Sequence, residues 1–426
     1  MKPTHTNSTL SRGVSALSRH MQCTLVLGAC LWAGLAQAQT GYDLAALERL
    51  GKSTSPALMA SRTDIQGAES AVRSASAYPN PEIEYQRGTF KPRTGSTGNG
   101  HADSIGITQA LELPSIRAAR IGAAEAVLAA TQANDRLVEA EWLSRLRLRY
   151  FELLRREAEL LNAREDLKLT ENLTSRIRHR VESGESPRFE LIKAEAELLN
   201  AQKNAQAAAA RVTHSRLQLR QAVGPDLPDD FTLIGHLTDI PDIQALNPVE
   251  PLIEENNPLL LRAKSEVSRA EQQLALEKAQ RLPSFALKAT QNTDPETRVT
   301  TGGIVLSIPI WDRRSGRIGE ASAQLTKAHH QLRDQTFALR QSLAMAYQQY
   351  EIARSQVAAL EAGILRQAEA ALKVAESAYR FGERGFIEVL DAQRVYRAAR
   401  TELTIASYEL AAAWVEFEKL RAQIGE

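Results

Sequence analysis

The chain has almost no cysteine and no long apolar run beyond its N-terminal segment. Its 426 residues include two cysteines, Cys23 and Cys30. Loss of the N-terminal segment would remove both, which excludes disulfides and thiolate metal sites from the rest of the chain. That remainder also lacks the roughly 18 consecutive apolar residues that a membrane-spanning helix needs. If the protein crosses a bilayer, it therefore does so with strands.

An excess of either charge and a catalytic constellation are also lacking. The chain has 52 Lys and Arg against 51 Asp and Glu, and loss of residues 1–38 removes three basic residues, giving 49 − 51 = −2. This balance predicts no nucleic-acid partner. No histidine after residue 38 stands in a chelating spacing, so we expect no metal site and no cofactor. These histidines are His101, His179, His214, His236, His329 and His330.

The N-terminal segment predicts export. Basic residues precede an apolar stretch, residues 23–36, which ends in the small-residue site Ala36-Gln37-Ala38. This order is typical of a secretory signal peptide, here residues 1–38. In a competing interpretation Leu27-Gly28-Ala29-Cys30 is a lipoprotein box and Cys30 is lipidated. Both interpretations export the chain.

The rest of the chain contains two copies of one unit, separated by about 200 residues. Gly184-Glu185 is followed by Glu190, and Gly382-Glu383 is followed at the same offset by Glu388. The predicted repeats are residues 39–224 and 252–426. The Pro- and Asp-rich residues 225–251 form a predicted connection.

Each repeat is predicted to contain a helix, two strands, a very long helix, a turn and a final helix. No proline interrupts residues 115–186, so a helix there could extend about 100 Å. The second repeat has a heptad pattern, interrupted at Gln367, that predicts a coiled-coil seam. Its members are Leu339, Leu343, Ala346, Tyr350, Ala353, Val357, Leu360, Ile364, Ala371, Val374 and Ala378.

Four segments alternate between apolar and polar residues and predict strands at residues 81–90, 103–113, 283–291 and 299–308. About ten residues is the length of a tilted transmembrane strand. Lipid tolerates no open sheet edge, and closed barrels begin at about eight strands, so four strands predict an oligomer. Alternation alone also fits a soluble pair of β-hairpins.

The chain after the signal peptide resembles the TolC-type outer-membrane factor family, the outer membrane efflux proteins. The duplicated layout matches that family, and residues 379–392, YRFGERGFIEVLDA, resemble its second helical turn. The implied fold is mainly α with transmembrane β. It is a homotrimer whose 12-stranded barrel lies in the cell outer membrane and continues as a periplasmic coiled-coil tunnel. The implied function is that of an exit duct and not of an enzyme.

The resemblance also implies partners: a periplasmic adaptor, an inner-membrane pump of the resistance-nodulation-division type, and outer-membrane lipid. Residues 306–318, LSIPIWDRRSGRI, resemble the CzcC-like branch that serves heavy-metal cation exporters. The first repeat has LELPSI at residues 111–116, where that branch would have a glycine-containing turn. Export of drugs or proteins by the same duct stays open, as does a periplasmic coiled-coil adaptor or scaffold.

Two turns are implied to dock the adaptor, because glycine permits a tight or left-handed backbone at a helix end. A C-cap that contacts nothing is the alternative. The residues of these tips are Gly184, Glu185, Ser186 and Pro187 in the first repeat, and Gly382, Glu383, Arg384 and Gly385 in the second.

The resemblance places Glu388 and Asp391 in an acidic ring at the pore entrance. Their i, i+3 spacing puts both on one helix face, where they would attract cations. It also implies that Tyr379, Arg384 and Glu190 latch the closed tunnel, with an ion pair between Arg384 and Glu190. A solvated helix face and an incidental surface pair are the respective alternatives.

Overall fold

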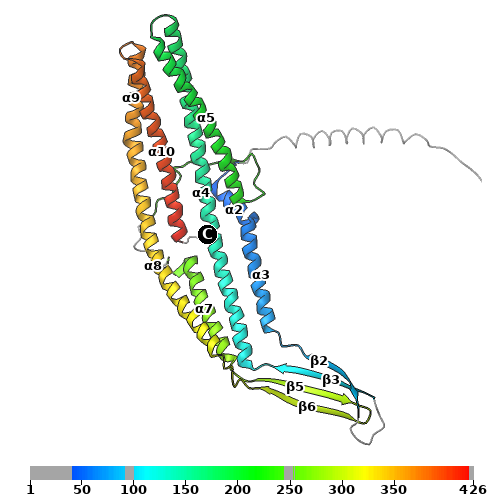
Figure 1. Cartoon of the computed structure of the whole chain (residues 1–426). Coiled ribbons are helices and arrows are strands. Elements are labelled where there is room, and N and C mark those ends of the chain that lie inside the picture. Colours follow the sequence, from blue (N-terminus) through cyan, green and yellow to red (C-terminus); the bar gives the residue numbers. More distant parts are fainter. Residues whose placement is uncertain (1–40, 92–99, 244–252, 254, 422–426) are drawn as a thin grey trace, which may run out of the picture.

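The computed structural model describes residues 41–91, 100–243, 253 and 255–421 of the chain (Figure 1). The predicted signal peptide and Cys30 lie outside these residues. The predicted connection is described up to residue 243, and it contains a short strand, β4 (Thr232–Leu233), paired in parallel with β1 (Gly41–Tyr42).

The order of helices and strands occurs twice along the chain, as predicted. In the first repeat it is α3 (Pro56–Ser76), β2 (Glu82–Phe90), β3 (Gly100–Leu111), α4 (Pro114–Glu182) and α5 (Arg188–Val223), with α2 (Leu44–Thr54) before them. In the second it is α7 (Pro258–Ala279), β5 (Ser284–Thr293), β6 (Arg298–Ser307), α8 (Ser315–Ala359), the π-helical turn η1 (Leu360–Ile364), α9 (Leu365–Arg380) and α10 (Phe386–Arg421).

The strands form one antiparallel sheet in the order β2-β3-β5-β6 (Figure 1). Strand β3 begins earlier and ends earlier than predicted. The two repeats meet along β3 and β5, where Leu111 pairs with Phe285. Strands β2 and β6 are the two edges of this sheet and pair with no further strand of the described chain.

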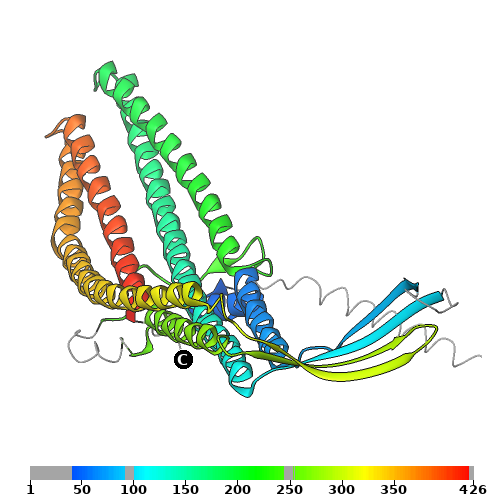
Figure 2. The same ribbon diagram turned by 60° about the horizontal axis from the view of Figure 1, so that its bottom comes forward.

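Two helical hairpins extend away from the sheet, α4 with α5 and α9 with α10 (Figures 1 and 2). Helix α4 has 69 residues, so it is about 104 Å long at 1.5 Å per residue. Nearer the sheet, α3, α4, α7 and α8 lie side by side in that order, like the strands to which they connect. Each repeat thus supplies half of the sheet and one hairpin.

The predicted seam of the second repeat holds up to Leu360 and then shifts. Every predicted member from Leu339 to Leu360 is buried, whereas Ile364 and Val374 are 50% and 69% exposed. The π-helical turn η1 lies at this point. A π turn takes up one extra residue, so the inward face moves by one position, to Ala368, Leu372 and Tyr379. The predicted continuation through Ile364 and Val374 was therefore wrong.

The largest apolar core lies midway along the molecule, where α2, α4, α5 and the end of α10 meet. We call it the central cluster. Phe151 and Trp414 pack edge to face with ring centroids 6.1 Å apart. The Trp142 indole donates to the Ala222 carbonyl (2.9 Å), and the Tyr150 hydroxyl donates to the Ile234 carbonyl (2.8 Å). Its buried members include Leu47, Leu58, Leu146, Leu153, Leu219, Val223, Leu227, Phe231 and Tyr350.

Candidate functional sites at the helical tips and on the sheet

The two predicted tips have the same backbone geometry. Gly184 follows α4 with φ of 80°, and Gly382 follows α9 with φ of 74°. In the first tip the Glu185 N–H donates to the Arg180 carbonyl and the Gly184 N–H to the Val181 carbonyl; the second tip repeats both bonds. This is the Schellman motif, which requires a left-handed residue at the glycine position.

Lack of room for a side chain does not explain why glycine occupies these two positions. A Cβ at Gly184 or Gly382 would meet nothing within 4 Å in the chain. The positive φ alone therefore explains why glycine stands there. Both tips lie at the end of the molecule opposite the sheet (Figure 1). Their predicted role in docking an adaptor stays a prediction.

A small apolar cluster joins the two tips and contains the predicted latch residue Tyr379. Its other buried members are Ile177, Ala194, Phe386, Val389 and Leu390. The guanidinium carbon of Arg180 lies 5.0 Å from the centre of the Tyr379 ring. Arg180 comes from α4 and Tyr379 from α9, so this contact links the hairpins. The sequence prediction did not include Arg180.

The structure brings Tyr379 and Glu190 together but separates Arg384 from them. Burial raises the pKa of Tyr379; Arg180 lowers it and the Glu190 carboxylate raises it further. The Tyr379 hydroxyl and Glu190 Oε2 are both buried, and neither has a hydrogen-bond partner of good geometry among the described residues. Two buried polar groups thus lie at the contact between the hairpins.

The predicted ion pair of Arg384 with Glu190 does not form within the chain. Arg384 Nη1 instead lies 2.6 Å from Glu388 Oε2, and both side chains are exposed. The reason is local geometry: Arg384 lies two residues before the start of α10, and Glu388, four residues further along, lies in its first turn. Glu190 lies close enough to Tyr379 for its carboxylate to raise the pKa of that side chain.

The predicted acidic residues Glu388 and Asp391 are both exposed near the start of α10, but each has a cation close by. Arg384 pairs with Glu388, and Asp391 contributes to the raised pKa of Arg394, whose main cause is its hydrogen bond to Glu197. Within one chain Glu388 is therefore paired with Arg384, whereas Arg394, the cation near Asp391, is itself paired with Glu197. The sequence prediction counted only the acids.

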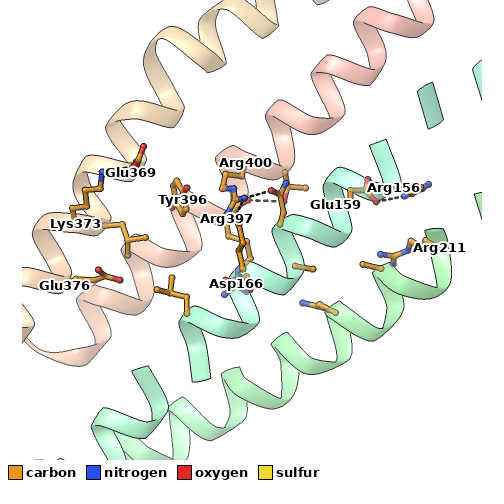
Figure 3. A pocket seen from close by; sticks show the side chains of 18 residues that line it. Arg156, Glu159, Asp166, Arg211, Glu369, Lys373, Glu376, Tyr396, Arg397 and Arg400 are labelled. Atoms are coloured by element: carbon orange, nitrogen blue, oxygen red, sulfur yellow. Dashed lines mark hydrogen bonds and ion pairs between the residues drawn. The ribbon is translucent and has the colours of Figure 1, made fainter. Parts of the chain in front are cut away.

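A polar contact between α4 and α10, which sequence analysis missed, lies between the tips and the central cluster (Figure 3). We call it the polar seam. Gln393 is 2% exposed, and its amide donates to Asp166 (3.3 Å) and Thr170 (3.1 Å). Arg397 pairs with Asp166 at 3.0 Å. Its other members are Asn162, Glu165, Arg400 and Thr404.

A heptad pattern on α10 could have revealed the polar seam. The residues that face α4 follow the spacing 386, 390, 393, 397, 400, 404, 407, 411 and 414. The stripe is apolar at both ends, at Phe386 and Trp414, and polar in its middle. Beside this middle part lies a cavity of about 540 Å³ between the two hairpins, lined by charged residues of both signs (Figure 3).

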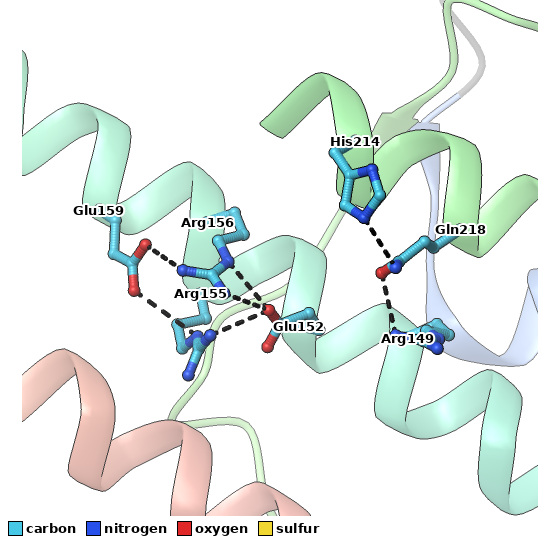
Figure 4. Close-up of polar contacts among 7 residues, drawn as sticks. All are labelled: Arg149, Glu152, Arg155, Arg156, Glu159, His214 and Gln218. Carbon is cyan, nitrogen blue, oxygen red and sulfur yellow. Dashed lines mark hydrogen bonds and ion pairs between the residues drawn. The ribbon is translucent and has the colours of Figure 1, made fainter. Parts of the chain in front are cut away.

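Charged residues also cover α4 beyond the polar seam (Figure 4). Arg155 and Arg156 both bind Glu152, and Arg156 reaches Glu159 at 2.8 Å. These i, i+3 and i, i+4 pairs stabilise the helix surface. His214 of α5 contacts Gln218, whose side chain accepts from Arg149 (2.9 Å). Within the described residues no group of three potential metal ligands occurs.

The sheet has one apolar and one polar face. On the apolar face, side chains of neighbouring strands align in four rows: Leu111–Phe285–Leu306, Gln109–Leu287–Ile304, Ile83–Ile107–Ala289–Gly302 and Tyr85–Ile105–Gln291–Thr300. The next row, away from the helices, is polar: Arg87–Asp103–Thr293–Arg298. The opposite face carries mainly polar side chains, Glu82, Glu84, Gln86, Lys288, Thr290 and Asn292, together with Val299 and Val305. Ile83 and Ile304 are more than 70% exposed.

A search of the described helices finds none with the length and apolar character needed to cross a membrane.

Comparison with known proteins gives consistent matches. The model of a family described as outer membrane efflux protein matches residues 50–225 and 251–423. CzcC of Cupriavidus metallidurans, a cobalt-zinc-cadmium resistance protein, is 25% identical over 353 residues, 80% of this chain and 81% of that protein. The outer membrane efflux protein BepC of Brucella suis is 26% identical over 394 residues, 89% of this chain and 84% of that protein.

The fold is also that of solved structures. A structure of CusC superimposes with a TM-score of 0.78 at 17% identity, covering 90% of this chain and 92% of that chain. A membrane protein from Pseudomonas aeruginosa gives the same TM-score and identity, covering 89% of this chain and 90% of its own.

Proposed function

The chain belongs to the outer membrane efflux protein family, and from this premise we propose that it is the exit duct of a tripartite machine that exports heavy-metal cations. Proteins of this family are outer-membrane channels and not enzymes, and they act as trimers with a periplasmic adaptor and an inner-membrane pump. A periplasmic adaptor or scaffold, the alternative from another class, does not agree with this membership.

The four-stranded sheet is the observation that supports the duct. Its apolar face is exposed in the single chain, and its edge strands, β2 and β6, pair with no further strand among the residues that the structure describes. Three copies would supply 12 strands, closing the sheet so that no edge meets lipid and the apolar face meets the bilayer. The long hairpins would then line a tunnel through the periplasm.

The proposal that the duct exports metal cations rests on two resemblances. One is the similarity to CzcC, named for cobalt, zinc and cadmium resistance, and the other is residues 306–318. Deletion of the gene should lower tolerance to Co²⁺, Zn²⁺ and Cd²⁺ while leaving tolerance to hydrophobic drugs unchanged. The reverse result would assign the duct to drugs, the second candidate, which the similarity to BepC keeps in view.

The tips formed by residues 184–187 and 382–385 would receive the adaptor. Gly184→Trp with Gly382→Trp should abolish export, because the indole rings would occupy the space that the adaptor needs. Trimers should still assemble, because no atom of the chain lies within 4 Å of a Cβ at either position. The matched control is Gly184→Ala with Gly382→Ala, which imposes the same strain at positive φ with little bulk. Equal export by the Trp and Ala pairs would refute docking at the tips.

At the pore entrance, Glu388 and Asp391 would form stacked acidic rings in the trimer, and Tyr379, Glu190 and Arg384 would hold the closed state. Arg384→Gln should free Glu388 and raise cation preference in planar-bilayer recordings, whereas Glu388→Gln with Asp391→Asn should lower it. Low salt should enlarge both differences, because screening is then weak. Identical selectivity in all variants would place these carboxylates outside the pore.

A further inference from the structure

The connection between β6 and α8 is longer than its counterpart in the first repeat. There β3 ends at Leu111 and α4 begins at Pro114, which leaves two residues between them. In the second repeat β6 ends at Ser307 and α8 begins at Ser315, so seven residues, 308–314, join them. We call these seven residues the junction loop.

The junction loop is held in one conformation. Arg314 has φ of 56°. Among the described residues, every other residue with positive φ is a glycine. The Arg314 N–H donates to Asp312 Oδ1 (2.8 Å), and its guanidinium lies 2.8 Å from Glu277 at the end of α7. The Arg314 and Glu277 side chains are 26% and 14% exposed. A left-handed conformation is costly for arginine, so these bonds hold it in place.

This rigid loop presents apolar side chains to the surroundings. Trp311 is 93% exposed, and Ile308 and Ile310 are 58% and 56% exposed. Arg313 and Arg317, on either side of the start of α8, are exposed as well. An exposed tryptophan with neighbouring arginines is the combination that anchors proteins at a membrane–water interface.

The junction loop also lies at the height along the sheet where a membrane–water interface is expected. It follows Leu306, a member of the apolar row nearest the helices. The polar row that contains Arg298 lies eight residues back along β6, about 27 Å along the strand at 3.4 Å per residue. At a strand tilt of about 40° this length rises about 21 Å along the membrane normal, close to the roughly 25 Å apolar band of outer-membrane barrels. The junction loop is therefore at the helix-side edge of the band and the Arg298 row at the other.

We infer that Trp311 inserts into the phospholipid headgroup region of the leaflet nearer the helices and anchors the duct there. The indole would lie among the glycerol groups, and Arg313 and Arg317 would bind lipid phosphates. This inference rests on the outer-membrane location, and not on the cargo. Continuity with the apolar face and the flanking arginines favour lipid over a neighbouring subunit.

Tryptophan fluorescence of the reconstituted full-length trimer tests the anchor. The other tryptophans of the described chain, Trp142 and Trp414, are 3% and 8% exposed in the central cluster and serve as internal controls. In phosphatidylcholine vesicles, lipids brominated near the headgroup end of their acyl chains should quench part of the emission. Lipids brominated deep in the chains should quench less. Trp311→Phe should remove most of this quenching.

Three results would overturn the inference: no quenching, equal quenching by deep bromines, or unchanged quenching in Trp311→Phe. A blue-shifted Trp311 emission without quenching would show that a neighbouring subunit covers it. Metal tolerance is measured separately on the same variant. Quenching without any effect of gene deletion on metal tolerance would refute the proposed cargo and leave the anchor standing.

Discussion

The central cluster and the polar seam are two parts of the same contact between the repeats. The central cluster is built from apolar side chains, and the polar seam from polar and charged ones. In the central cluster Trp414 of α10 meets Phe151 of α4 in a buried apolar core. In the polar seam Gln393 and Arg397 meet Asp166 and Thr170. Both regions lie on one heptad stripe of α10.

The difference indicates where the molecule can open. The free energy gained by burying apolar side chains depends on the area removed from water and not on direction. All of it is lost when the two surfaces separate. Polar groups exchange their partners for water at a much smaller net cost, about 1 kcal/mol per hydrogen bond. If the hairpins separate, we therefore expect the polar seam to open before the central cluster does.

The largest expected effect comes from breaking the central cluster. Phe151 is 2% exposed, so Phe151→Ala should lower the free energy of unfolding by about 3–5 kcal/mol. Thermal unfolding of the purified protein measures this loss. Lys203→Ala on the exposed surface of α5 is the control, with a change within about 0.5 kcal/mol. A stable Phe151→Ala variant would remove the distinction between the two regions.

A smaller effect is expected from the polar seam. Gln393→Ala removes the donor to Asp166 and Thr170, so we expect a loss of about 1–3 kcal/mol, because buried acceptors lose their partner. Resting conductance should rise, because the hairpins are held less firmly. Gln367→Ala, at an exposed position of α9, is the matched control. Unchanged conductance in Gln393→Ala would contradict a role in closure.

Alkaline pH should act on the central cluster and leave the polar seam intact. Burial raises the pKa of Tyr150 from 10.0 to about 12. The neutral phenol is thus favoured in the folded chain, and its contribution is complete below pH 10 and is lost as the pH rises from 10 towards 12. Tyr150→Phe should flatten this part of the stability–pH curve. An equally steep decline in the variant would assign it to other groups.

The smallest effect on stability is expected at the exposed pair of Arg384 and Glu388. Arg384→Gln should leave the unfolding temperature nearly unchanged, because exposed ion pairs contribute little. Its effect should appear in ion selectivity, opposite in sign to that of Glu388→Gln, and in a higher resting conductance, because Arg384 is proposed to hold the closed state. A large fall in unfolding temperature would mean that this pair is buried against another subunit.

The sequence predicted much of the fold because the fold is built from repeated local patterns. The alternation in residues 283–291 located β5, and the heptads from Leu339 to Leu360 located the inward face of α8. Neither pattern located the π-helical turn, because after Leu360 both registers carry small or apolar residues: Ala371, Val374 and Ala378 in the predicted one, and Ala368, Leu372 and Tyr379 in the shifted one. The predicted positions of Ile364 and Val374 failed for that reason.

The candidate site was predictable only in part. The glycines at 184 and 382 indicated the turns because a left-handed residue is a local requirement. Within one chain Arg384 pairs with Glu388 and not with Glu190 as predicted, since Glu388 lies four residues away whereas Glu190 belongs to the other hairpin. Arg180 was missed because its contact with Tyr379 joins residues about 200 positions apart.

By itself, the sequence determined the duplication, the kinds of helices and strands, and the two glycine turns, since each follows from side chains a few residues apart. Only the tertiary structure decided which charges neutralise one another, that Gln393 is buried, and that Trp311 stays exposed on a rigid loop. These features depend on distances between helices and strands remote in the chain, which packing sets and local periodicity does not.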